Sequence, residues 1–195
     1  GGFVKSSSDL AIPDIQLHFI PILMHGLIDP IPKQHGMSIH ACQLRPQSRG
    51  SVLPGSADPF ASPLVDFNFL DNEHDWKVIQ RSYEIVRDIA QAKAWDGLMG
   101  EPSRPDKHLT DEGRIREFLR QVCETVYHPV GTCKMGSDEQ AVVDAELRVR
   151  GIEGLRVADA SIMPTLIGGN TNAPCMMIGE KCSDLILGRK LPAEA

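Results

Sequence analysis

Hydrophobic and polar side chains alternate along two segments within the first fifty residues, 14–22 and 37–45. Because successive side chains of a strand point to opposite faces of a sheet, this pattern predicts two half-buried β-strands. Residues 47–52 are interpreted as a turn into a further short strand. Two shorter runs, 147–149 and 155–157, predict a pair of strands joined by a turn.

Helical spacing of apolar residues begins farther along the chain. Residues 75–94 carry a stripe formed by Ile79, Tyr83, Val86 and Ala90. The acidic residues of this segment, Asp75 among them, are interpreted as a solvated helix face. Thr110 is placed to cap a second helix with an acidic first turn. A last helix is predicted from near Pro174 to Gly188, which is a favoured terminator. The order of strands, helices, strands and helix predicts an α+β fold with a mostly antiparallel sheet flanked by helices.

The composition is typical of a globular protein, since 42% of the 195 residues are hydrophobic and 24% are charged. No apolar run reaches the ~18 residues needed to cross a bilayer, so this segment gives no indication of membrane association. The net charge of −6 gives no reason to expect nucleic acid as a partner. The five cysteines are scattered and odd in number, which favours a reducing, cytoplasmic compartment over a disulfide framework.

The most specific motif runs from Tyr127 to Gly136, where His128 stands before a proline and a glycine. A neutral imidazole, with an unperturbed pKa of about 6.5, can accept a proton near pH 7. A lone histidine is more often structural than catalytic, so the surrounding run carries the argument. Cys123, His128 and Cys133 raise the question of zinc, but their spacing does not match a zinc knuckle and no second pair completes a tetrahedral site. No metal is therefore expected.

A second motif, residues 168–174, places Asn170 and Asn172 on a glycine-rich loop that opens the last helix. An asparagine NH₂ group can donate a hydrogen bond to a developing alkoxide but is not a useful base. The alternative is that both asparagines only cap the helix, which asparagine does well. Asn172 is interpreted as the cap and Asn170 as the ligand-binding residue.

Together with residues 154–164, these two motifs resemble the C-terminal end of the glucose–methanol–choline (GMC) family of FAD-dependent alcohol oxidoreductases. The likeness is greatest to the choline dehydrogenase-like alcohol dehydrogenases and extends more weakly over nearly the whole chain. It implies a GMC-type substrate domain with C-terminal pieces of an FAD-binding domain. In such an enzyme His128 would accept the hydroxyl proton of a small alcohol, Asn170 would hold the alkoxide, and hydride would pass to the flavin.

The resemblance also implies the residues that contact the cofactor. Asp159 and Ala160 correspond to a strand end that approaches the pyrophosphate and ribityl region, where a carboxylate can accept hydrogen bonds from hydroxyl groups. An ordinary solvent-facing turn aspartate is the equal alternative for Asp159. Thr171 and Asn172 correspond to the backbone that approaches the pyrimidine side of the flavin.

The dinucleotide-binding run Gly-x-Gly-x-x-Gly is absent from this sequence. The family carries that motif near its N-terminus, so this chain is interpreted as a C-terminal fragment. Residues 1–125 would form part of the substrate-binding domain, and residues 126–195 the active-site segment with the last part of the FAD-binding domain. The N-terminal FAD-binding part would be its partner, and the isolated chain would bind FAD weakly and be inactive. The alternative is a stand-alone binding or structural domain without catalysis.

Overall fold

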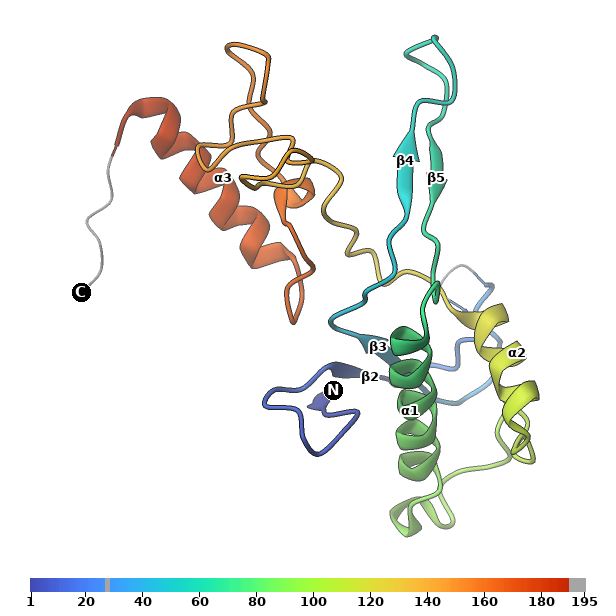
Figure 1. The fold of residues 1–195 in the computed structure, drawn as a ribbon. Helices are drawn as coiled ribbons and strands as arrows, with labels where there is room; N and C mark the ends of the chain where they lie inside the picture. Colours follow the sequence, from blue (N-terminus) through green and yellow to red (C-terminus); the bar gives the residue numbers. More distant parts are fainter. Residues whose placement is uncertain (27–28, 190–195) are drawn as a thin grey trace. The chain divides into compact units, whose positions relative to one another are not determined.

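The computed structural model describes residues 1–26 and 29–189, and its antiparallel sheets and helices confirm the α+β class (Figure 1). The last six residues of the predicted segment 126–195 lie outside the described residues. The chain divides into two compact units. The first unit combines residues 1–50 and 67–124, and the second combines residues 51–66 and 125–195.

The sheet of the first unit is antiparallel, with the strand order β1 (Gly2–Val4), β2 (Ile15–Ile20) and β3 (Ser38–Gln43). The two predicted strands are confirmed, although each is shorter than the alternating pattern. Ile15 and Leu17 are buried, as the alternation predicts. β1 was not predicted, because three residues are too short for a periodic signal.

Helix α1 (Glu73–Ala90) contributes apolar side chains to two different buried clusters. Val78 joins the buried residues of β2, while Trp76 and Tyr83 form a second cluster with α2 (Glu112–Val122). α1 ends four residues before the predicted end, and a 3₁₀ turn, η1 (Lys93–Trp95), follows.

The N-terminus of α2 corrects one prediction. The capping residue is Asp111, whose side chain accepts a 2.8 Å hydrogen bond from the backbone N–H of Arg114. Thr110 therefore does not cap this helix. Threonine and aspartate are both good N-cap residues, so the sequence alone could not show which of the two adjacent positions caps the helix.

The prediction that Asp75 belongs to a solvated helix face is wrong. Its side chain is 1% exposed, and its carboxylate binds the turn that follows β3. Gln43 Nε2 donates to Oδ1 at 2.8 Å, the backbone N–H of Gln47 donates to Oδ1 at 2.9 Å, and the N–H and hydroxyl of Ser48 donate to Oδ2. Burial alone raises the pKa of Asp75, but these hydrogen bonds outweigh burial and hold the pKa below its ordinary value.

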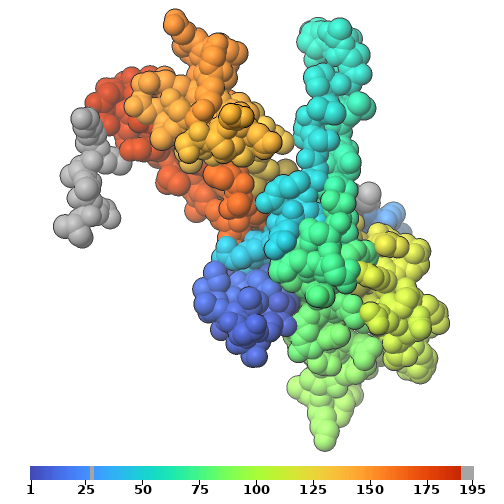
Figure 2. All heavy atoms as spheres, in the orientation of Figure 1, coloured from blue at the N-terminus to red at the C-terminus, as the bar shows by residue number. Residues whose placement is uncertain are grey.

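A two-stranded antiparallel hairpin, β4 (Ser51–Leu53) and β5 (Leu64–Asp66), is grouped with the second unit. Every residue of both strands is exposed. Figure 2 shows the heavy atoms of the hairpin, coloured cyan to turquoise, as spheres.

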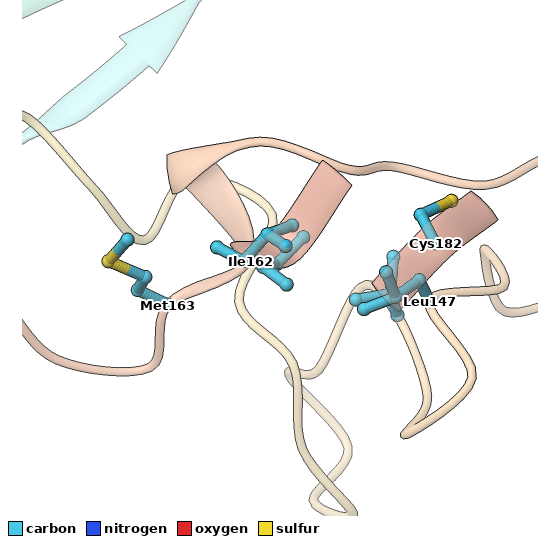
Figure 3. Packing of buried hydrophobic residues seen from close by; sticks show 6 residues of the cluster. Leu147, Ile162, Met163 and Cys182 are labelled. Atoms are coloured by element: carbon cyan, nitrogen blue, oxygen red, sulfur yellow. The ribbon is translucent and has the colours of Figure 1, made fainter. Parts of the chain in front are cut away.

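The rest of the second unit folds around helix α3 (Asn172–Leu187) and the 3₁₀ turn η2 (Ala160–Ile162). The predicted strands 147–149 and 155–157 exist only as isolated bridges and two backbone hydrogen bonds. The predicted end of the last helix is confirmed, because Gly188 closes α3 in the left-handed conformation with a φ of 66°. The buried cluster of this unit comprises Val143, Leu147, Ile162, Met163, Ile178 and Cys182, part of which Figure 3 labels.

Candidate functional site

His128 lies in a loop whose backbone is held in unusual conformations on both sides. Tyr127 has a φ of 61°, which a non-glycine residue rarely adopts, and Gly131 has a φ of 91°. The backbone N–H of Tyr127 donates a 2.9 Å hydrogen bond to the hydroxyl of Thr125. His128 itself is half-buried and makes no hydrogen bond with any described residue. Backbone strain of this kind concentrates at functional sites, and the sequence carried no signal for it at Tyr127.

The loop of His128 is hydrogen-bonded to the segment that carries Asp159. The backbone N–H of Cys133 donates to the carbonyl of Ser161 at 3.0 Å, and that of Met135 donates to the carbonyl of Ile162 at 2.7 Å. A side chain at Gly131 would meet the carbonyl oxygen of Met163 at 3.3 Å, so glycine permits the close approach here. The two predicted site segments are therefore joined within one unit.

Asp159 and Ala160 play different structural parts. Asp159 is exposed and caps η2, with its Oδ1 accepting a 2.8 Å hydrogen bond from the N–H of Ser161. No described residue donates to its Oδ2. Ala160 is half-buried, and its side chain packs against the buried cluster.

The start of α3 corrects the assignment of the two carboxamides. The N-cap position is Thr171, which is buried and makes no capping bond with its side chain, and Asn172 is the first helical residue. Asn172 is therefore not the cap. The first hydrogen bond of the helix runs from the N–H of Cys175 to the carbonyl of Thr171 at 3.0 Å. The N–H groups before Cys175 at the start of α3 have no acceptor within the helix, so this end of the helix favours a negatively charged group.

Asn170 is exposed and directly precedes the N-cap residue of α3. Asn170 and His128 both belong to the second unit. The pairing of these two residues at one substrate oxygen stays a prediction.

The described residues contain no group of three or more His, Cys, Asp or Glu side chains that could hold a metal ion. Cys123 is half-buried, and burial raises the pKa of its thiol above the ordinary value. Among the described helices, none has the length and apolar character required to span a membrane.

Comparison with known proteins gives matches to flavoenzymes. The family model described as GMC oxidoreductase matches residues 46–179. Oxygen-dependent choline dehydrogenase of Klebsiella pneumoniae is 45% identical over 97% of this chain and 34% of its own length. The same enzyme of Acinetobacter baumannii is 44% identical with the same coverage. The chain thus spans about a third of the length of these curated relatives.

The solved structures agree with this match. Pyridoxine 4-oxidase from Mesorbium loti superposes with a TM-score of 0.79 and 28% identity, over 97% of this chain and 38% of that one. Formate oxidase of Aspergillus oryzae superposes with a TM-score of 0.85 and 29% identity, over 93% of this chain and 32% of that one.

Proposed function

This chain belongs to the GMC oxidoreductase family, and from that premise we propose that it works as part of a longer FAD-dependent alcohol dehydrogenase. The proposed reaction is the oxidation of a primary alcohol to an aldehyde, as the choline dehydrogenases among its relatives suggest. The active protein would combine this chain with the FAD-binding part that supplies the phosphate-binding turn. By itself, the chain would bind FAD weakly and would not turn over.

The residues at the start of α3 and at η2 fit a flavin. Oδ2 of Asp159 has no donor among the described residues and can accept a hydrogen bond from a ribityl hydroxyl. A side chain at Gly169 would meet no atom within 4 Å, so the loop before α3 leaves space beside its backbone. The N-terminus of α3, with Thr171 and Asn172, would favour a negatively charged ring. When bound, the flavin supplies the acceptor for the hydride of the carbinol carbon.

The chain itself would handle the proton and the oxygen of the substrate. The His128 imidazole would accept the hydroxyl proton, because an imidazole nitrogen can act as a general base and His128 makes no competing hydrogen bond with the described residues. Asn170 Nδ2 would donate to the substrate oxygen as negative charge develops on it. A carboxamide does not take up a proton near neutral pH, so Asn170 would not compete with His128 for the hydroxyl proton.

One observation carries this proposal. The loop of His128 is hydrogen-bonded to the Asp159–Met163 segment by Cys133 and Met135. This arrangement supports a shared site, because a proton acceptor and a cofactor-binding loop that fold together keep their spacing when a ligand binds.

The test is His128→Ala in the longer protein. We expect kcat to fall by ~10²- to 10⁴-fold, which is the usual contribution of a general base. The flavin content should stay normal, because His128 is not among the residues proposed to hold the cofactor. The matched control is His74→Ala, which removes an exposed histidine from α1. Wild-type turnover of the His128 variant between pH 6 and 9 would rule out His128 as the base.

The proposed partners are a small alcohol and the FAD-binding part of the same protein, with no nucleic acid. We propose a cytoplasmic location, because the cysteines are scattered and odd in number. Subcellular fractionation of the native protein would test it. Recovery in a membrane or periplasmic fraction would contradict it.

A further inference from the structure

The β4–β5 hairpin exposes apolar side chains on both of its faces. Val52 lies opposite Val65 on one face, and Leu53 lies opposite Leu64 on the other. These four side chains are 50%, 50%, 55% and 61% exposed, respectively, and Phe60 at the hairpin tip is 95% exposed. A two-stranded hairpin is marginally stable alone in water, and apolar cross-strand pairs left in water gain nothing from burial.

The ends of the hairpin limit how a partner can bind it. Pro54 follows β4 directly and Pro63 precedes β5 directly. Proline has no N–H to donate, so it prevents another strand from extending along these edges toward the tip. The hairpin contains two acidic residues and no basic one, so it does not match an anionic surface. Its faces therefore fit an apolar surface rather than a strand edge or a polyanion.

The chain enters and leaves the hairpin at a hydrogen-bonded base. Asn68 Nδ2 donates to the carbonyl of Arg49 at 2.9 Å, and the N–H of Asp71 donates to the hydroxyl of Ser48 at 2.9 Å. Ser48 is in turn bound to the buried carboxylate of Asp75. These hydrogen bonds hold the segments from which the chain enters and leaves the hairpin, whereas every residue of its two strands is exposed.

We propose that the β4–β5 hairpin is a docking arm for the part of the same polypeptide that precedes this chain, an inference that rests on the proposed function. The exposed apolar area of the five side chains is on the order of 500 Å². A stable interface between separate proteins buries about 800 Å² on each partner. Covalent attachment raises the effective concentration of the partner surface, so a smaller contact suffices within one chain. The chain covers only 34% of the length of its choline dehydrogenase relative, so the rest of such a polypeptide is long enough to supply that surface.

Hydrogen–deuterium exchange of the 195-residue chain and of the longer polypeptide tests the inference. We expect peptides covering residues 51–66 to exchange about 10-fold or more slowly in the longer polypeptide. Equal exchange in the two proteins would overturn the inference. Protection in the 195-residue chain that rises with protein concentration would also overturn it, because it would identify a second copy as the occupant.

A pair of variants separates docking from the internal stability of the hairpin. Leu53→Ser combined with Leu64→Ser removes one apolar face, and Leu98→Ser removes a loop leucine that is 78% exposed outside the hairpin. The double variant should leave the thermal midpoint of the 195-residue chain unchanged and lower that of the longer polypeptide, while the control changes neither. An equal drop in both proteins, or no drop in either, would overturn the inference.

Flavin absorbance of the longer polypeptide distinguishes the two proposals. A yellow, active protein whose hairpin exchanges rapidly refutes only the docking arm. A protein that stays colourless with added FAD refutes the proposed function on which the docking arm rests.

Discussion

Replacing Asp75 tests whether a buried carboxylate holds the turn that leads into the hairpin. Asp75→Ala leaves the backbone N–H groups of Gln47 and Ser48 without their acceptor. Gln47 is exposed and Ser48 is half-buried, so water can partly replace the lost acceptor. The expected loss of unfolding free energy is therefore about 2–3 kcal/mol, near the cost of one buried donor without a partner. Asp75→Asn keeps one acceptor oxygen but turns an NH₂ group toward a donor, so its expected cost is about 1–2 kcal/mol.

The assay is urea denaturation followed by tryptophan fluorescence, because Trp76 is the next residue of α1 and is buried. The matched control is Glu84→Gln on the same helix, where the carboxylate forms an exposed ion pair with Arg81 at 2.7 Å. An exposed pair of this kind contributes less than about 1 kcal/mol. If Asp75→Ala costs no more than the control, the hydrogen-bonded carboxylate does not stabilise the turn.

The pH dependence gives an independent check on Asp75. Its pKa in the folded protein lies below the ordinary value, so the folded state binds this proton less readily than the unfolded state. The contribution of Asp75 to stability is therefore present above the unfolded pKa of about 3.9 and is lost as the pH falls through the folded pKa. The stability difference between the wild type and Asp75→Asn should narrow on acidification from pH 7 to pH 3. A constant difference over that range would refute the depressed pKa.

Four further predictions concern the candidate site. Calorimetric titration of FAD into the 195-residue chain should give no sub-micromolar binding, because the sequence contains no Gly-x-Gly-x-x-Gly turn; tight binding would contradict this. Gly131→Ala should destabilise the chain by about 1–2 kcal/mol in thermal denaturation, since its φ is 91° and the new methyl group would meet a carbonyl at 3.3 Å. Gly151→Ala has a φ of 78° but open space, so it should cost less and separates the methyl contact from the backbone strain; an equal cost would contradict the contact. Asn170→Ala should slow flavin reduction in the longer protein by about 10- to 1000-fold in anaerobic stopped flow, and Asn170→Asp by at least as much. Asn172→Ala should leave stability within about 0.5 kcal/mol, because this residue is not the cap; the reverse pattern for the two asparagines would exchange their roles.

The sequence alone determined the elements whose signal is local. The alternation around Ile15 and Leu17 and the stripe of α1 predicted a strand and a helix, because burial on one face imposes a period on the residues themselves. Gly188 marked the end of α3 because few other residues adopt its left-handed backbone conformation. The motif around His128 is also a local signal, because it is a contiguous run of residues, and its resemblance identified the family.

Tertiary structure decided the features that depend on distant partners. Asp75 looks like a surface residue in its helix, and only the approach of the turn at Gln47 and Ser48 makes it a buried acceptor. Cap positions were missed by one residue at both Thr110 and Asn172, because neighbouring polar residues have similar propensities and the packing of the helix selects which one precedes its first turn. Hydrogen bonds between segments about thirty residues apart likewise brought the loop of His128 to Asp159, and no periodicity within either segment could record a contact that exists only after the chain has folded.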